Sequence, residues 1–240
     1  MHKQNRWGED AYPTDYRKEV DDAINFSGLS SDFFLRGKAD SVVSILNEYG
    51  LDASKALCLD IGCGIGAMHP PLRNRVSNLA GVDISVEAIG TAAAVNPWVT
   101  YKSYEGTRLP YEDASYDFCF TTCVMHHVPP AHWDNFIAEA ARVTRPNGML
   151  AVFEMNPLNP LTRLAMMRCA FDHDAVRLWP HQVRKLMLKN GFEPVMQQYL
   201  FFVPVDKGWA RKIDGALYWL PAGAQYVVCG RRMAGPSSPA

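Results

Sequence analysis

The chain has 240 residues, of which 48% are hydrophobic and 20% are charged, and its formal net charge at pH 7 is -1. This composition is typical of one globular domain with small additions. The near-neutral charge excludes a general electrostatic attraction to nucleic acid or to an anionic membrane. No uncharged apolar run approaches the ~18 residues of a membrane span.

The six cysteines are the next feature of the composition. None belongs to a Cys-x-x-Cys pair, and most lie in apolar surroundings, which favours reduced and buried thiols in a cytoplasmic protein. The first 20 residues contain no apolar core segment, so we expect no secretory signal.

Residues 1–50 are interpreted as an N-terminal helical extension. Residues 1–15 are polar and irregular, and a short helix is expected from residue 15 or 16 to about residue 25. A second helix follows Ser30 or Ser31, with apolar residues spaced by three and four, and Gly50 ends it. We expect this extension to fold over a ligand as a lid. Its aromatic residues are Trp7, Tyr12, Tyr16, Phe26, Phe33 and Phe34.

From residue 51 to residue 232 apolar strand patterns alternate with helix patterns. Strands are expected within 55–62, 78–85, 98–106, 116–124, 145–156, 193–205 and 224–232. Helices are expected within 67–76, 85–95, 132–144 and 178–192, the first of them starting near two prolines. The alternation predicts an α/β fold with a doubly wound, mostly parallel sheet, whose final two strands pair as an antiparallel hairpin.

Two insertions interrupt this pattern, at about 157–178 and 204–222, and a disordered tail is expected at 233–240. On a helix within the second insertion, Trp209, Ile213, Leu217 and Leu220 share a side near three basic residues. We interpret this side as packing against the sheet edge or against a second copy of the chain in a homodimer, in preference to contact with a membrane surface.

The stretch "LDIGCGIG" after the first strand carries three glycines at alternate positions, Gly62, Gly64 and Gly66. Glycines in the first βα turn let the backbone approach a ligand, and Asp83 ends the second strand 21 residues after Gly62. This spacing suits a carboxylate on ribose hydroxyls and predicts a nucleoside site. The glycines also fit the dinucleotide pattern, but Asp60 favours a cation or ammonium group over a pyrophosphate.

The segments together resemble class I S-adenosylmethionine-dependent methyltransferases, of the group that includes the quinone-biosynthesis methyltransferases. The resemblance runs from about residue 55 to residue 192. It rests on "LDIGCGIG", "GVDIS", "EGTRLPYEDASYDF", "VMHHV" and "ARVTRPNGMLAVFE". It implies a Rossmann-like methyltransferase fold with seven strands, an antiparallel last strand, and S-adenosylmethionine as cofactor, converted to S-adenosylhomocysteine.

The same resemblance implies roles for individual residues. Asp60 would balance the cofactor's ammonium group, and Asp83 would bind the ribose. Ile84 would pack on the adenine, Glu105 stands where the family usually has Asp, and Gly106 would offer its N–H to the ring. The further cofactor-binding candidates are Gly62, Cys63, Gly64, Gly66, Thr107, Thr122 and Cys123.

The loop after the fourth strand is expected to face the sulfonium and the methyl acceptor. His126 and His127 are the candidate general bases there, needed only if the acceptor must lose a proton. The seven histidines are otherwise dispersed, so we predict no metal site. The predicted function is methyl transfer to a small, partly hydrophobic organic acceptor. The alternatives are an NAD(P)-dependent oxidoreductase and a non-catalytic S-adenosylmethionine-binding protein.

Overall fold

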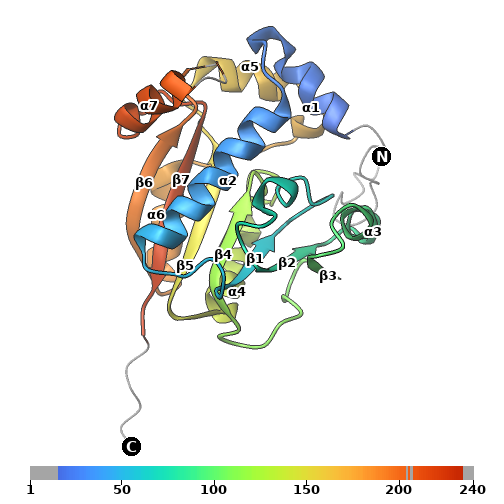
Figure 1. The fold of residues 1–240 in the computed structure, drawn as a ribbon, viewed down its shortest axis with the longest axis vertical. Helices are drawn as coiled ribbons and strands as arrows, with labels where there is room; N and C mark the ends of the chain where they lie inside the picture. The colour runs from blue at the N-terminus through green and yellow to red at the C-terminus, as the bar shows by residue number, and fades with distance from the viewer. Residues whose placement is uncertain (1–15, 204, 206–207, 235–240) are drawn as a thin grey trace, which may run out of the picture.

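Seven strands form one sheet in the order β3-β2-β1-β4-β5-β7-β6. The computed structural model describes residues 16–203, 205 and 208–234 (Figure 1). The first five strands of that order run parallel, and β7 is antiparallel to both β5 and β6. The strands are β1 (Leu57–Ile61), β2 (Asn78–Asp83), β3 (Thr100–Ser103), β4 (Tyr116–Thr122), β5 (Thr144–Met155), β6 (Phe192–Leu200) and β7 (Gln225–Arg232). The predicted fold class and the antiparallel last strand are confirmed.

Seven α-helices accompany the sheet in the part of the chain that the structure describes. They are α1 (Tyr16–Ile24), α2 (Ser31–Glu48), α3 (Val86–Val95), α4 (Trp133–Val143), α5 (Pro160–Arg168), α6 (Pro180–Lys189) and α7 (Gly208–Leu217). Ser85 caps α3 as predicted, because its side-chain oxygen accepts a hydrogen bond from the N–H of Ala88 at 3.1 Å. Short 3-10 turns lie at Asn25–Ser27, Pro70–Leu72, Pro130–His132 and Ala170–Asp172.

The helix expected within residues 67–76 does not form, and that prediction was wrong. Only a 3-10 turn is present, at Pro70–Leu72. The chain leaves the helical backbone conformation directly after this turn, because Arg73 has a ψ of 136° and Asn74 has a positive φ of 63°. Helix α2 covers the neighbouring part of this face, and its Leu46 packs in the same apolar cluster as Leu72.

Two apolar clusters, one on each face of the sheet, make up the core. On one face α2 contributes Val42 and Ile45, while on the other α4 contributes Ile137 and α6 contributes Val183. In Figure 1, α2 crosses the front of the sheet and α4 lies behind it. Because helices cover both faces, the central strands are apolar along most of their length rather than alternating.

The chain order changes direction at β1. From β1 the chain moves outward through β2 to β3, then returns to the other side of β1 to form β4 and β5. In open α/β sheets, ligands bind beyond the carboxyl ends of the strands at such a switch point. Helices α1 and α5 lie at this end of the sheet, at the top of Figure 1. A ligand site is therefore expected in the space beneath these two helices.

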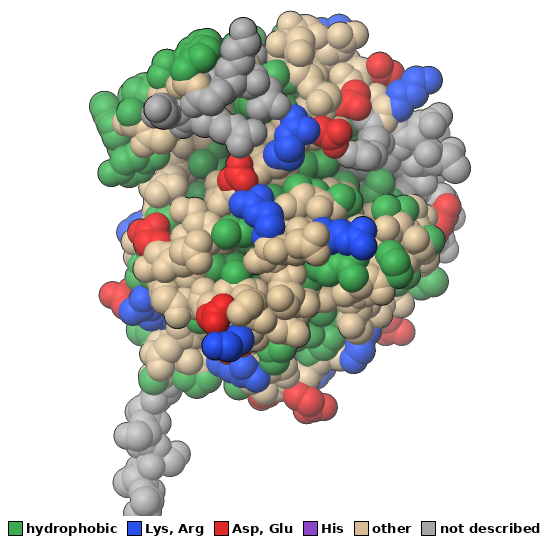
Figure 2. Space-filling view, viewed as in Figure 1, with side chains coloured by type: hydrophobic (Ala, Val, Ile, Leu, Met, Phe, Trp, Pro, Cys, Tyr) green, Lys and Arg blue, Asp and Glu red, His purple; other side chains and the backbone are tan. Residues whose placement is uncertain are grey.

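Helix α7 presents large apolar side chains at the surface. Trp209 is 53% exposed and Trp219, just beyond the helix, is 64% exposed. Figure 2 shows hydrophobic side chains gathered at the upper left, where α7 lies. Within the described residues, no helix has both the length and the apolar character needed to cross a membrane. Contact of this surface with a second copy of the chain stays a prediction.

Residues 1–15 and 235–240 lie outside the described part of the chain. The prediction of an irregular start, with Trp7 and Tyr12, and most of the predicted disordered tail fall on them. The predicted domain boundaries and the lid role of the N-terminal extension likewise stay predictions.

Candidate functional site

The three glycines form a turn that runs from the end of β1 against the end of β2. Gly62, Gly64 and Gly66 have positive φ values of 78°, 52° and 70°, which residues with a Cβ rarely adopt. The N–H of Gly62 donates to the carbonyl oxygen of Val82 at 2.7 Å. A Cβ on Gly62 would lie 2.6 Å from both methyl carbons of Val124. The bare backbone is therefore required for the packing of the turn itself.

Asp83 joins this turn to the end of β2. Its Oδ2 accepts a hydrogen bond from the N–H of Gly64 at 2.7 Å, and its Oδ1 accepts one from the N–H of Ser85 at 2.9 Å. The side chain is buried, and this burial raises the pKa of Asp83 above its ordinary value. Each carboxylate oxygen keeps a second lone pair, so the residue can still accept from a ligand hydroxyl.

Asp60 lies behind the turn and is fully buried. Its Oδ2 is 3.1 Å from Nε2 of His69, whose Nδ1 is hydrogen-bonded to the hydroxyl of Tyr101, while Oδ1 of Asp60 has no hydrogen-bond partner among the described residues. An unpartnered buried carboxylate oxygen is costly, and a bound ammonium group or an ordered water would satisfy it. Asp60 and Gly66 support the cavity from behind instead of lining it.

A cavity of about 1350 Å³ opens over the carboxyl ends of the central strands. It exceeds the ~300–1,000 Å³ of an ordinary small-molecule site, so it has room for a cofactor and a second molecule. Most of the predicted site residues line it together. They are Gly62, Cys63, Gly64, Asp83, Ile84, Glu105, Gly106, Thr107, Thr122, Cys123, His126 and His127.

The loop after β4 is fixed from below by a glutamate of β5. Glu154 is 1% exposed, and its Oε1 accepts hydrogen bonds from the N–H groups of Met125 and His126 at 2.8 Å and 3.3 Å. Its Oε2 is 2.6 Å from Nδ1 of His126. Cys123, at the start of the loop, has a φ of 58°, a conformation that is uncommon outside glycine. The loop is thus held in an unusual shape at the cavity wall.

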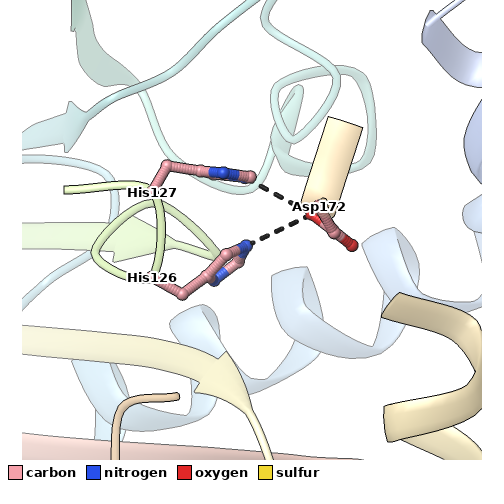
Figure 3. A group of neighbouring side chains, drawn as sticks. All are labelled: His126, His127 and Asp172. Carbon is pink, nitrogen blue, oxygen red and sulfur yellow. Dashed lines mark ion pairs between the residues drawn. The ribbon is translucent and has the colours of Figure 1, made fainter. Parts of the chain in front are cut away.

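His126 and His127 lie side by side and both point toward Asp172, as Figure 3 shows. The Nε2 atoms of both rings are 3.5 Å from Oδ1 of Asp172, and the ring centroids are 4.1 Å apart. His126 is 2% exposed and fits between two carboxylates, whereas the side chain of His127 is 30% exposed toward the cavity.

The two imidazoles have opposite protonation. Burial by itself would lower the pKa of His126, but Glu154 and Asp172 outweigh it and raise that pKa well above its ordinary value. Burial and the neighbouring charge of His126 lower the pKa of His127 to about 4. At neutral pH His126 is therefore a fixed cation, and His127 is a neutral imidazole that faces the cavity.

The same three side chains are the group that comes nearest to a metal site in the described part of the chain. Ligand atoms of His126, His127 and Asp172 all lie within 4.8 Å of one another. The prediction of no metal stays a prediction.

Sequence reasoning missed several residues at this site. Glu154 was detectable, because it is the one carboxylate within the apolar pattern of residues 145–156 and such a residue is rarely buried without a function. Asp172, Lys38 and Phe201 come from the insertion after β5, from α2 and from the segment after β6. Nothing in their local patterns distinguishes them, since only the fold brings them to the cavity.

These residues fit the cofactor that the resemblance implies. S-adenosylmethionine carries a sulfonium and an ammonium group, and the described side chains at the cavity include several carboxylates, among them Asp83, Glu105 and Asp172. The free lone pairs of Asp83 are acceptors of the kind that the ribose hydroxyls require, whereas Asp60, which does not line the cavity, would reach the ammonium group only through a bridging water.

Comparison with known proteins gives similar sequences over the same region. Residues 59–152 match a family model described as a methyltransferase domain. A 27-O-demethylrifamycin SV methyltransferase from Amycolatopsis mediterranei is 37% identical over 103 residues, covering 39% of this chain and 36% of that protein. A ubiquinone biosynthesis O-methyltransferase from Sinorhizobium medicae is 29% identical over 168 residues, covering 63% of this chain and 65% of that protein. The chain therefore spans between about a third and two thirds of the length of these relatives.

Solved structures share the fold over nearly the whole chain. The crystal structure of magnesium protoporphyrin IX methyltransferase from Synechocystis PCC 6803, with bound S-adenosylhomocysteine, has a TM-score of 0.61 and 19% sequence identity. The similarity covers 94% of this chain and 90% of that one. At this level of identity the comparison concerns the fold alone.

Proposed function

Residues 59–152 of this chain form a methyltransferase domain of the S-adenosylmethionine-dependent class, and from that premise we propose that the protein transfers a methyl group from S-adenosylmethionine to a small, partly hydrophobic organic acceptor. The resemblance predicted from the sequence is confirmed for this domain. The observation that carries the proposal is the meeting of the glycine turn and Asp83 in one large cavity at the switch point of the sheet.

The cofactor end of the cavity is assigned to the turn and to the ends of β2 and β3. Asp83 would accept from the ribose hydroxyls, Ile84 would pack on the adenine, and Glu105 with Gly106 would bind its polar edge. The bare backbone at Gly62 and Gly64 would admit the amino-acid portion. S-adenosylmethionine, when bound, supplies a methyl group that its positive sulfonium makes electrophilic.

The acceptor end is assigned to the loop after β4 and to aromatic residues from segments added to the sheet. The aromatic lining residues beyond the cofactor positions include Phe33, Phe34, Phe136, Phe201 and Phe202. Rings in this number favour a flat or partly hydrophobic molecule over a highly charged one. The rate gain would come from holding the acceptor atom in line with the methyl group, without a covalent bond to the protein.

A proton acceptor is available if the acceptor is a hydroxyl. The relative from Sinorhizobium medicae is named an O-methyltransferase, and a hydroxyl must lose its proton during methyl transfer. Of the two candidate bases, His127 has the neutral ring and faces the cavity, whereas His126 is held between Glu154 and Asp172. We assign the base role to His127 and a positioning role to His126.

The proposal is tested by binding and by turnover. Isothermal titration should give a measurable affinity for S-adenosylhomocysteine and none for NAD, because the acidic cavity suits a cation and not a pyrophosphate. Label from methyl-labelled S-adenosylmethionine should then appear on members of a panel of phenols, amines and carbon acids.

Each alternative function has its own outcome in these measurements. Binding of NAD in place of S-adenosylhomocysteine would contradict the proposal and favour an oxidoreductase. Tight binding of S-adenosylhomocysteine without turnover on any class of acceptor would favour a non-catalytic binding protein.

A further inference from the structure

Lys38 is a buried ammonium group in the wall of the cavity. It lies in α2, outside the matched methyltransferase domain, and is 6% exposed. Lysine is almost never buried to this degree unless its charge is paired, because moving an ammonium group out of water costs several kcal/mol in real proteins. A lysine in this position therefore requires an explanation.

Its neighbours in the protein do not neutralise it. The hydrogen bond that Nζ makes is to Sγ of Cys123, at 3.7 Å. Burial raises the pKa of the Cys123 thiol, so the sulfur is uncharged at neutral pH. Among the described residues, no carboxylate oxygen lies within 4.0 Å of Lys38 Nζ. No residue in the described part of the chain therefore supplies a counter-ion to this buried ammonium group.

The charges around the cavity make this lysine distinct. Apart from Lys38, the described charged residues of the lining are carboxylates and the His126 imidazolium, which is already paired with Glu154 and Asp172. Lys38 is the one lysine or arginine among them. A cation placed among acids at a ligand site gives that site one position for an anionic group.

The packing of α2 fixes where Lys38 points. Gly37 has no side chain, and the ring of Phe201 occupies the place where a Cβ would be. Phe201 also contacts the rings of Phe33 and Phe34, with centroids 5.6 Å and 5.0 Å away. This cluster locks the helix against the cavity rim, so that Lys38 reaches Cys123 in the loop that follows β4.

We propose that Lys38 is the anion-recognition residue of this cavity and binds an anionic oxygen of a molecule held there. The inference rests on the proposed function, which provides two sources for that oxygen. One is the carboxylate of the cofactor's amino-acid portion, and the other is a carboxylate or other acidic group of the acceptor.

The decisive variant is Lys38→Met, which keeps the length of the side chain and removes its charge. Isothermal titration with S-adenosylhomocysteine and with 5′-methylthioadenosine, which lacks the amino-acid portion, tests whether Lys38 binds the cofactor's carboxylate. Titration of the S-adenosylhomocysteine-saturated protein with 4-hydroxybenzoate and 4-hydroxybenzamide tests whether Lys38 binds an acidic group of the acceptor. Lys55→Met is the matched control, since the side chain of Lys55 is 82% exposed.

If the cofactor supplies the anion, Lys38→Met weakens S-adenosylhomocysteine by about 10- to 100-fold and leaves methylthioadenosine within about twofold. If the acceptor supplies it, both nucleosides bind unchanged and the variant loses the wild type's preference for the benzoate over the benzamide. Lys38→Arg should retain most of the affinity in either case, because it keeps the charge.

Unchanged cofactor affinity together with no preference of the wild type for the benzoate would overturn the proposal. So would a loss of methylthioadenosine binding in Lys38→Met, because it would show a structural role.

The melting temperature of Lys38→Met should equal or exceed that of the wild type, since an unpaired buried charge is removed. Should this variant not fold, Lys38→Gln takes its place. Wild-type protein that binds neither nucleoside would contradict the proposed function itself. The benzoate and benzamide titrations, made then on protein without nucleoside, would decide Lys38.

Discussion

His126 and His127 are neighbours in the chain whose surroundings give them different chemistry. The backbone of the loop aims both rings at Asp172, but only His126 also reaches Glu154 in β5. One ring therefore becomes a charged link between two carboxylates, and its charge helps to keep the other ring neutral. The assignment of His127 as the base depends on which of the two rings lies within hydrogen-bond distance of Glu154.

The protonation of His127 leads to a prediction about pH. Because its pKa is lowered to about 4, its ring is already unprotonated at pH 6, and kcat/KM should show no fall between pH 8 and pH 6 from this residue. The fall should come near pH 4, as the ring gains its proton. Once an acceptor is identified, His127→Gln should lower kcat by about 10²- to 10⁴-fold and remove that acidic limb.

The control for this experiment is His181→Gln, because His181 is an exposed histidine of α6 that does not line the cavity. It should leave the rate and the pH profile unchanged. A wild-type profile with its acidic limb near pH 6.5, or a His127→Gln enzyme of normal rate, would contradict the assignment.

At the scale of elements, the turn after β1 and the loop after β4 form one packed unit. Gly62 faces Val124 from that loop so closely that a single added carbon would overlap both methyl groups. Asp83 at the end of β2 holds the N–H of Gly64, so three successive parallel strands contribute to the same small region. The turn, to which the proposal assigns the cofactor, and the loop, to which it assigns the acceptor, are therefore packed directly against each other.

Gly62→Ala tests the close packing of Gly62 against Val124. The alanine must adopt a φ near 78° and displace Val124, so we expect a loss of about 2–4 kcal/mol in the free energy of unfolding, measured with urea. Affinity for S-adenosylhomocysteine should fall with it. Gly90→Ala is the matched control, because this exposed position in α3 has open space around it, and helix propensity predicts a gain of about 0.5–1 kcal/mol.

Equal stability of the two alanine variants would show that Val124 can move aside at little cost. The turn and the loop would then be independent of each other. That result would remove the argument that the bare backbone at Gly62 is needed for packing.

At the scale of the whole molecule, the carboxyl ends of the strands form the base of the cavity, and the segments added to the sheet form its sides. Helices α1, α2 and α5 and the residues after β6 all contribute lining residues, although α1 and β6 are separated by most of the chain. Residues 59–152 by themselves would leave the cavity open. Specificity for the acceptor is therefore expected to lie in segments outside residues 59–152.

Hydrogen exchange on binding tests this arrangement. Saturation with S-adenosylhomocysteine should slow amide exchange in α1 and α5, which both line the cavity, because a ligand beneath them restricts their opening. Strand β6 does not line the cavity and should exchange at the same rate with and without ligand. Equal protection in all three elements, or in none, would contradict the view that these helices cover the ligand.

The sequence was sufficient for the features that depend on neighbours in the chain. Apolar periodicity predicted each strand and most helices, and the spacing between the glycine turn and Asp83 predicted a nucleoside site. Local pattern misled within residues 67–76, where a 3-10 turn replaces the expected helix, and it did not predict α5 within the insertion at about 157–178. These features are short-range, so the order of residues alone determines them.

The tertiary structure decided which residues face one another across the cavity. Lys38 lies 85 residues before Cys123, and His126 lies 28 residues before Glu154, yet each pair is in contact. Whether a histidine is charged or neutral depends on such contacts, because the pKa responds to burial and to charges within a few ångströms and not to sequence spacing. The sequence by itself determined the fold, the turn and the kind of cofactor. The folded chain decided which imidazole faces the cavity as a neutral ring, and it placed Lys38 where no described carboxylate lies beside it.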